Sequence, residues 1–394
     1  MKRKRFSLFV TVFCVASLFC LTLSAQEIKT NADEKTKTRV NELFELAISY
    51  AKEKKFDQAI DTWRELLRLD PVNPYALHNL GAALSNTKRH QEALEAFQAA
   101  VNFAPGNAIF QASLGGAYMN LRRWDESLAV LNEAVRLDPT RGATYNMLGF
   151  LFDNTRRFEE ALVVNKKAIE FAPENPANFH NLGLTYMKLG KAADAIPPLE
   201  QALKMAPTYL SARYHLSNAL SKLRKYREAV DSYTKLLELD PDNPEIIILR
   251  AWNYTYLGGS GREAAADAER YLKLYGWRTK SAPFQALIAI IGFRSLRMEE
   301  RANAVMAQAL KKADPAAWPY SIIRFFDGQM TAEDLLAVAA DNDQRTEAHA
   351  YIGMYLLLNN KNAEARIQFE WVKEYGTRNY YEYALALSEL QRLQ

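Results

Sequence analysis

The side chains that could do chemistry are few in this sequence. His78 and His180 each open the same four residues, His-Asn-Leu-Gly, and an imidazole can act as a base or as a metal ligand. The usual companions of such chemistry are missing, because the chain contains no HExxH, GxSxG, Walker A or GxGxxG motif. Its two cysteines, Cys14 and Cys20, lie in one apolar stretch near the start. We therefore expect a protein that is not an enzyme and that has no metal site and no cofactor.

The first residues have the pattern of a secretory signal. Residues 2–5 are basic, residues 6–23 are uncharged and apolar, and Ala25 is a small residue suited to cleavage. We expect a signal peptide at residues 1–25 and a polar linker at residues 26–39. The protein would then be exported, and either periplasmic or extracellular. An uncleaved signal anchor is the alternative, and it would be the only attachment to a membrane.

The charge balance argues against a nucleic-acid partner. The chain has 50 basic and 46 acidic residues, and four of the basic ones precede the apolar stretch of the signal. The remaining sequence therefore carries equal numbers of both signs. Because proteins that bind nucleic acids usually show a basic surplus, we expect no nucleic-acid partner.

A repeat of 34 residues sets the elements that must position any site. Its marker is a proline that recurs at Pro71, Pro105, Pro139, Pro173, Pro207 and Pro241. If the proline is position 32 of the repeat, position 8 is small throughout and position 24 is large in most repeats. A small residue lets two helices approach closely, and a large one fills the space around their contact. Each repeat is therefore predicted to be an antiparallel helix pair that ends before the proline.

The next pair begins with its own signal in several repeats. An asparagine in the N-cap position and a proline in the first helical position follow three of the markers, at Asn73-Pro74, Asn175-Pro176 and Asn243-Pro244. With Leu-Gly at positions 7 and 8 and alanine at position 20, the sequence resembles the tetratricopeptide repeat, or TPR. The resemblance implies an all-α fold, a TPR α-solenoid in which antiparallel helix pairs form a right-handed superhelix. We expect the array at residues 40–275, with about seven repeats.

The predicted binding site is the inner face of this array. In TPR proteins the first helix of each pair, helix A, lines the inner face, and the second is helix B. The positions that face inward are occupied by Phe44, His78, Asn79, Asn146, Phe150, His180, Asn181, Tyr214, Asn218, Trp252 and Tyr256. Aromatic side chains offer contact area and asparagines can pair with a peptide backbone, which suits the binding of protein or peptide segments. The alternative for each residue is that it only packs between neighbouring A helices.

The pattern becomes irregular after residue 275. We expect degenerate helical repeats and a C-terminal cap at residues 276–394, with one pair in residues 284–315, another around residues 348–369 and a last helix near residues 380–393. Irregular units either cap such an array or form a contact in a homodimer.

This last part has a resemblance of its own. Trp318-Pro319, residues 325–329 and residues 351–355 are similar to the C-terminal part of the new-lipoprotein-I type of bacterial envelope TPR adaptor. That resemblance implies that the partners are envelope hydrolases or proteases. The sequence therefore predicts an exported, non-enzymatic TPR scaffold or adaptor that binds segments or helices of partner proteins in cell-envelope assembly or maintenance.

Two alternatives remain. Basic residues recur in the turn between the helices of each pair, as at Lys88-Arg89, Arg122-Arg123 and Arg156-Arg157, and acidic residues follow them. These charges compensate the helix dipoles. They could also form a ridge for an anionic polymer, which would make the chain a cell-wall or polysaccharide-binding protein. The other alternative is an accessory TPR subunit of an envelope enzyme.

Overall fold

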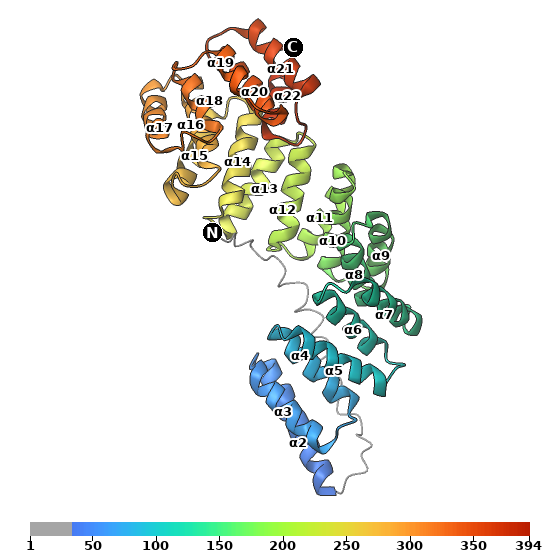
Figure 1. Cartoon of the computed structure of the whole chain (residues 1–394). Helices are drawn as coiled ribbons and strands as arrows, with labels where there is room; N and C mark the ends of the chain where they lie inside the picture. The colour runs from blue at the N-terminus through green and yellow to red at the C-terminus, as the bar shows by residue number, and fades with distance from the viewer. Residues whose placement is uncertain (1–33) are drawn as a thin grey trace. The chain divides into compact units, whose positions relative to one another are not determined.

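The described chain is helical throughout. The structure, a computed structural model, describes residues 34–394, and within them it has 21 α-helices and no strand (Figure 1). The predicted signal peptide and residues 26–33 of the predicted linker lie outside the described residues. The prediction of an all-α fold made of antiparallel helix pairs is confirmed. No helix in the described part is long and apolar enough to cross a membrane.

The helices belong to two compact units, which meet in sequence between Pro207 and Thr208. The described part of the first unit holds five pairs of an A helix and a B helix. They are α2 (Glu34–Lys52) with α3 (Phe56–Leu69), α4 (Pro74–Asn86) with α5 (His90–Phe103), α6 (Ala108–Asn120) with α7 (Trp124–Leu137), α8 (Gly142–Asn154) with α9 (Phe158–Phe171), and α10 (Pro176–Lys188) with α11 (Ala192–Met205).

The first helix begins earlier than the repeat predicts. Helix α2 begins at Glu34, so that residues 34–39 of the predicted linker are helical. Glu34 places a negative charge in the first turn, which the helix dipole favours. Arg39, in the second turn, contacts α3, because its Nη2 lies 2.7 Å from Oε1 of Glu65.

The second unit combines regular pairs with extra helices. Its pairs are α12 (Leu210–Lys222) with α13 (Tyr226–Leu239), α14 (Pro244–Leu257) with α15 (Gly261–Tyr275), α16 (Ala282–Ser295) with α17 (Glu299–Lys312), and α20 (Asn342–Leu358) with α21 (Asn362–Tyr375). The short helices α18 (Pro319–Phe326) and α19 (Ala332–Val338) and the last helix, α22 (Tyr381–Arg392), lie outside the pairing. The change of sequence pattern at residue 275 falls inside this unit, where α15 packs against α16.

Asparagine caps begin four of the A helices. The side chains of Asn73, Asn107, Asn175 and Asn243 accept hydrogen bonds from backbone N–H groups in the first turn that follows each of them. These bonds satisfy donors that an uncapped helix leaves open. The predicted caps at three of these positions are confirmed, and Asn107 has the same role without a proline after it.

The two helices of a pair touch where position 8 meets position 24. A Cβ atom placed on Gly115 of α6 would lie 2.7 Å from the side chain of Leu131 of α7, and one on Gly183 would lie 2.6 Å from Leu199. Real Cβ atoms do not approach other atoms so closely. Position 8 is therefore small because the large residue of helix B occupies the space of its side chain.

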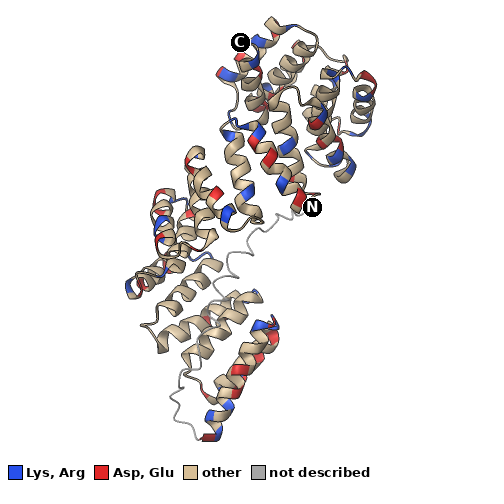
Figure 2. Ribbon diagram, turned by 180° about the vertical axis from the view of Figure 1, so that it is seen from behind, with Lys and Arg blue, Asp and Glu red and all other residues tan. Residues whose placement is uncertain are grey.

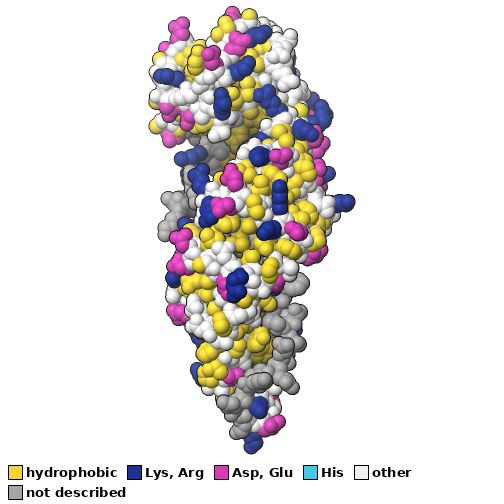
Figure 3. Space-filling view, turned by 90° about the vertical axis from the view of Figure 1, so that its right-hand side faces the viewer, with side chains coloured by type: hydrophobic (Ala, Val, Ile, Leu, Met, Phe, Trp, Pro, Cys, Tyr) yellow, Lys and Arg dark blue, Asp and Glu magenta, His cyan; other side chains and the backbone are white. Residues whose placement is uncertain are grey.

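The A helices of the first unit also lie side by side. Helix α4 contacts α6, α6 contacts α8, and α8 contacts α10. Helices α4 and α6 contain no charged residue, whereas lysines and arginines stand among acidic residues along many other helices (Figure 2). Apolar side chains also reach the surface between charged ones (Figure 3). A row of A helices with little charge is thus the face on which a site is expected.

The basic residues in the turns between the helices of each pair, here called the basic row, divide into two groups. In four turns the second basic residue forms an ion pair with the glutamate three residues later, namely Arg89 with Glu92, Arg123 with Glu126, Arg157 with Glu160, and Lys225 with Glu228. The first residue of each turn, such as Arg122, has a positive φ that turns the chain into helix B. Local ion pairs therefore use half of the row, which weakens the case for a ridge that binds an anionic polymer.

The contact between α6 and α7 predicts the effect of the Gly115→Ala substitution. We expect this variant to destabilise the first unit by about 1–3 kcal/mol, because the added methyl group must displace Leu131. Urea unfolding followed by circular dichroism measures the loss. Gly106→Ala is the matched control, since a Cβ atom there would have no atom within 4 Å. Equal losses in the two variants would contradict the close approach of α6 and α7.

Candidate functional site

The residues predicted to face a partner lie in both units. Phe44, His78, Asn79, Asn146, Phe150, His180 and Asn181 belong to the first unit, and Tyr214, Asn218, Trp252 and Tyr256 to the second. The structure joins some of them into one polar cluster, buries others between helices and covers two with another helix of the chain. Their role in partner binding stays a prediction, so the geometry of each group is described in turn.

Two of these residues lie in the core of the first unit. Phe44 packs edge to face on Trp63 of α3, with ring centroids 4.9 Å apart. The ring of His78 stacks on Phe110 of α6, and its Nε2 lies 2.9 Å from Oγ of Ser113. Both side chains are buried, and His78 is only 2% exposed. Both pack between helices in this structure, which agrees with the packing alternative, and their role in partner binding stays a prediction.

The surroundings of His78 also exclude a charged ring at neutral pH. Burial is the main cause that lowers the pKa of His78 to about 4; the charge of Arg141 acts in the same direction, and the hydrogen bond with Asn79 offsets only part of the shift. Within residues 34–394, no group of three or more histidine, cysteine, aspartate or glutamate side chains is arranged to hold a metal ion.

An amide cluster joins α8 to α10. Nδ2 of Asn181 donates to Oδ1 of Asn146 at 2.7 Å, and Nδ2 of Asn146 donates to Oδ1 of Asn178 at 2.8 Å. Asn178 is buried, and its Nδ2 donates to the carbonyl oxygens of Ala168 and Ala172 at the end of α9. The three side chains thus form a hydrogen-bonded chain that runs from the end of the B helix α9 to the inner face.

The exposed end of the amide cluster retains hydrogen-bonding capacity. Asn146 and Asn181 are half-buried, and each side-chain nitrogen has a second N–H beyond the one used in the cluster. His180 lies beside them, with its Nδ1 3.3 Å from Oδ1 of Asn181, but its side chain is 7% exposed. Phe150 is half-buried one turn after Asn146 on α8, and Asn79 is half-buried on α4. Amide groups of fixed orientation therefore lie near an aromatic ring on one face.

A second polar group supports this face, and the sequence analysis missed it. Nδ2 of Asn165 donates to Oγ1 of Thr185 at 2.9 Å, and the Nζ of Lys188 lies 3.2 Å from Oδ2 of Asp153. Burial raises the pKa of Asp153, and the charge of Lys188 opposes that shift. Asn165 occupies position 24, where Phe97 or Leu131 stands in other repeats. That polar exception was the signal that could have located the group.

In the second unit, Tyr214 and Asn218 bind neighbouring helices. Oη of Tyr214 donates to Oε1 of Glu245 of α14 at 2.5 Å, and Oη of Tyr233 of α13 donates to Oδ1 of Asn218 at 2.5 Å. Burial, together with the negative charge of Glu245, raises the pKa of Tyr214. The amide oxygen of Asn218 is therefore already engaged within the chain.

Helix α22 covers the two remaining predicted residues. The ring of Tyr381 stacks on that of Trp252, with centroids 5.2 Å apart and planes 10° from parallel. Oη of Tyr256 donates to the carbonyl oxygen of Tyr381 at 3.1 Å. Trp252 and Tyr256 are 3% and 5% exposed. Another helix of the same chain occupies that face in this structure, and the role of the two residues in partner binding stays a prediction.

The comparisons with known proteins agree on the repeat. The family model described as the cilia and flagella-associated protein 70 C-terminal domain matches residues 20–245. The C-terminal part of a TPR repeat-containing protein from Cytophaga hutchinsonii is similar in structure, with a TM-score of 0.50 and 19% identity over 61% of this chain and 98% of that one. PilW, a type IV pilus biogenesis factor, has a TM-score of 0.50 and 21% identity over 55% of this chain and 98% of its own. Both likenesses support the TPR fold.

The burial of His78 makes stability depend on pH. A histidine whose pKa is lowered by folding stabilises the native state above its unfolded value of 6.5, and this contribution is lost as the pH falls toward 4. Between pH 7 and pH 5 we expect the wild type to lose about 2 kcal/mol more stability than His78→Phe, whose ring can still stack on Phe110. Urea unfolding at both pH values tests this. The same pH dependence in both proteins would show that His78 titrates as it does in the unfolded chain.

Proposed function

Because this chain belongs to the TPR family described as the cilia and flagella-associated protein 70 C-terminal domain, we propose that it is a non-enzymatic scaffold for a partner protein. An extended segment of the partner binds on the inner face of α8 and α10. The observation that carries this proposal is the amide cluster of Asn146, Asn178 and Asn181, with Phe150 beside it.

The amide cluster suits a peptide backbone for a physical reason. Asparagine side chains that are free in solution lose rotamer entropy when they bind, which weakens the complex. Here the orientations of Asn146 and Asn181 are fixed before binding, because each amide is bonded to the next one in the cluster. Their remaining N–H groups can donate to backbone carbonyl oxygens, and the ring of Phe150 offers an apolar contact for a side chain of the segment.

The charge of this face favours a neutral segment. The neighbouring A helices α4 and α6 carry no charged residue, and in α8 and α10 the pair of Asp153 and Lys188 is neutral as a whole. An acidic or basic peptide would lose hydration here without gaining an opposite charge. We therefore propose that the bound segment is polar or apolar but uncharged where it crosses α8 and α10.

We further propose that the protein works outside the cytoplasm, in the assembly or maintenance of the cell envelope. The basic, apolar and small-residue pattern of residues 1–25 supports export. The similarity of residues 325–329 and 351–355 to an envelope TPR adaptor supports hydrolases or proteases of the envelope as partners.

Photocrosslinking tests where the partner binds. A benzophenone amino acid at position 150 is expected to yield discrete adducts with envelope proteins, because this side chain lies on the proposed face. The same amino acid at position 163 is the matched control, since Val163 lies on the B helix α9 and is 58% exposed. Adducts of equal yield at both positions would contradict the inner face as the site.

The amide variants test the chemistry of binding. Asn146→Ala combined with Asn181→Ala is expected to weaken capture of the crosslinked partner roughly tenfold, since each lost hydrogen bond is worth about 0.5–1.5 kcal/mol. Asn102→Ala on the B helix α5 is the control, because Asn102 is exposed and its side chain accepts from Gln98 of the same helix. Thermal unfolding of each variant confirms that the proteins compared are folded. Unchanged capture by the double variant would remove the amide cluster from the site.

A further inference from the structure

Helix α22 lies on the second unit as a ligand would lie in a groove. It contacts α14, α20 and α21, and its first residue, Tyr381, stacks on Trp252 of α14. Leu385 and Ala386 in its middle are fully buried. At its end, Nη2 of Arg392 donates to the carbonyl oxygen of Tyr256 at 3.0 Å. The face of α14 therefore contacts an aromatic ring at the start of α22 and a cation at its end, while the middle of α22 is buried in the second unit.

Buried carboxyl groups weaken this docking. Glu382, the second residue of α22, is 3% exposed, and it faces Glu347 of α20, which is 7% exposed. Neither carboxylate forms an ion pair with a lysine or arginine of the described chain; Glu382 accepts a hydrogen bond from Oη of Tyr351 at 3.3 Å and Glu347 one from Nε1 of Trp318 at 2.7 Å. Two acids in one poorly hydrated site repel each other once both are ionised.

The other groups around these acids do not relieve the repulsion. Helix α20 adds Tyr351 and Asp343, and α14 adds the hydroxyl of Tyr256. None of these groups carries a positive charge. Helix α21 reaches α22 through the carbonyl oxygen of Lys373, which accepts from Oη of Tyr383. From α13, Oη of Tyr226 accepts from Oγ of Ser388 at 3.2 Å. The only cation at the helix is Arg392, which pairs with Glu389 at the other end.

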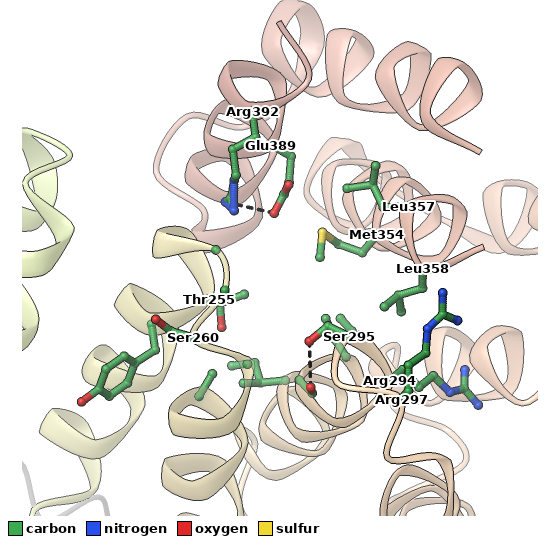
Figure 4. Close-up of a pocket in the computed structure, with 18 of the residues that line it drawn as sticks. Thr255, Ser260, Arg294, Ser295, Arg297, Met354, Leu357, Leu358, Glu389 and Arg392 are labelled. Carbon is green, nitrogen blue, oxygen red and sulfur yellow. Dashed lines mark hydrogen bonds and ion pairs between the residues drawn. The ribbon is translucent and has the colours of Figure 1, made fainter. Parts of the chain in front are cut away.

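The last turn of α22 is also incompletely packed. It borders a cavity of about 370 Å³ that is lined by the ends of α14, α16 and α20 as well. Figure 4 shows Glu389 and Arg392 on one side of this space and Met354, Leu357 and Leu358 of α20 on another. Atoms of a helix that border an open pocket lack the packed neighbours that a buried helix face has. Each end of α22 therefore combines a specific contact with an unfavourable feature, whereas its middle is fully buried.

We propose that the face of α14 beneath α22 is a binding surface for a helix of a partner protein, and that α22 is its intramolecular competitor. The partner helix opens with an aromatic residue that replaces Tyr381 on Trp252, has leucines at helical spacing, and carries no ionised acid at the position of Glu382. This surface is separate from the amide cluster of the first unit and does not depend on it.

Protonation controls how firmly the competitor is docked. Burial raises the pKa of Glu382 to about 7 and, together with the charge of Glu382, that of Glu347 to about 8. A group with a raised pKa binds its proton more tightly in the docked state. Docking is therefore strongest below the ordinary carboxyl value of 4.5 and weakens as the pH rises through 7 to 8.

Hydrogen exchange tests the release of α22. Between pH 6.0 and 8.5, and after correction for the intrinsic rate, we expect the opening constant of residues 381–392 to rise about tenfold relative to that of α16. In Glu382→Gln the rise should be at most half as large on a logarithmic scale. Glu364→Gln, an exposed position on α21, is the control and should behave as the wild type does. An opening constant that does not change with pH in the wild type overturns the release.

A labelled synthetic peptide tests the binding surface. The probe has the sequence of residues 378–394 with Glu382→Gln, so that it stays neutral at that position. We expect it to bind the full chain about tenfold more tightly at pH 8.5 than at pH 6.0, and to bind the Glu382→Gln chain weakly at both. Trp252→Ala should abolish binding, and Tyr256→Phe, which removes only a hydroxyl, should weaken it. Binding that is independent of pH, or that survives Trp252→Ala, overturns the proposal.

Discussion

The close approach of helix A to helix B within each pair is the constraint on which the rest of the structure depends. At Gly115 and Gly183 the space of a side chain is filled by Leu131 and Leu199 of the facing helix. This contact fixes how far apart the two helices lie and therefore which residues of helix A point away from helix B. Only those residues can contact the next pair or a ligand, so the inner face is a consequence of the pairing within each repeat.

The exception in the fourth repeat shows how a polar site arises without loss of the pairing. Asn165 replaces the large apolar residue of position 24, and its Oδ1 lies close to Gly149, where a Cβ atom would clash with it. A buried amide needs partners, and Thr185 of the next A helix supplies one. Further polar residues follow at Asp153 and Lys188. One polar residue in the helix contact thus accompanies a chain of hydrogen bonds across α8, α9 and α10.

The sequence predicted the fold well because the repeat is local. The proline markers, the small residues and the asparagine caps act within a few residues of one another, and each is found in the structure where the pattern places it. The capping box of Thr331 and Asp334, which begins α19, is equally local, although the sequence analysis did not identify it. Helix α2 begins earlier than expected, and the contact of Arg39 in its second turn with Glu65 of α3 is one that no repeat position encodes.

The predicted site was less reliable because position in a repeat does not tell what covers a side chain. His78 and Asn146 occupy the same position of helix A, yet the ring of His78 is enclosed by Phe110 and Ser113, whereas Asn146 is half-buried and bonded to other amides. The large aromatic neighbour decides the first case and the polar neighbour the second. The position sets the direction of a side chain, and the residues of the next repeat set its exposure.

Trp252 and Tyr256 illustrate the same limit over a longer distance in sequence. Their cover, Tyr381, lies more than a hundred residues later, so no pattern within a repeat could announce it. A face that binds an aromatic ring of its own chain has the chemistry to bind one from another protein, because stacking and a hydroxyl donor do not depend on which chain supplies the ring. Whether such a face is open is then decided by the relative free energies of the two occupants. The buried pair of Glu347 and Glu382 makes that of α22 less favourable as the pH rises.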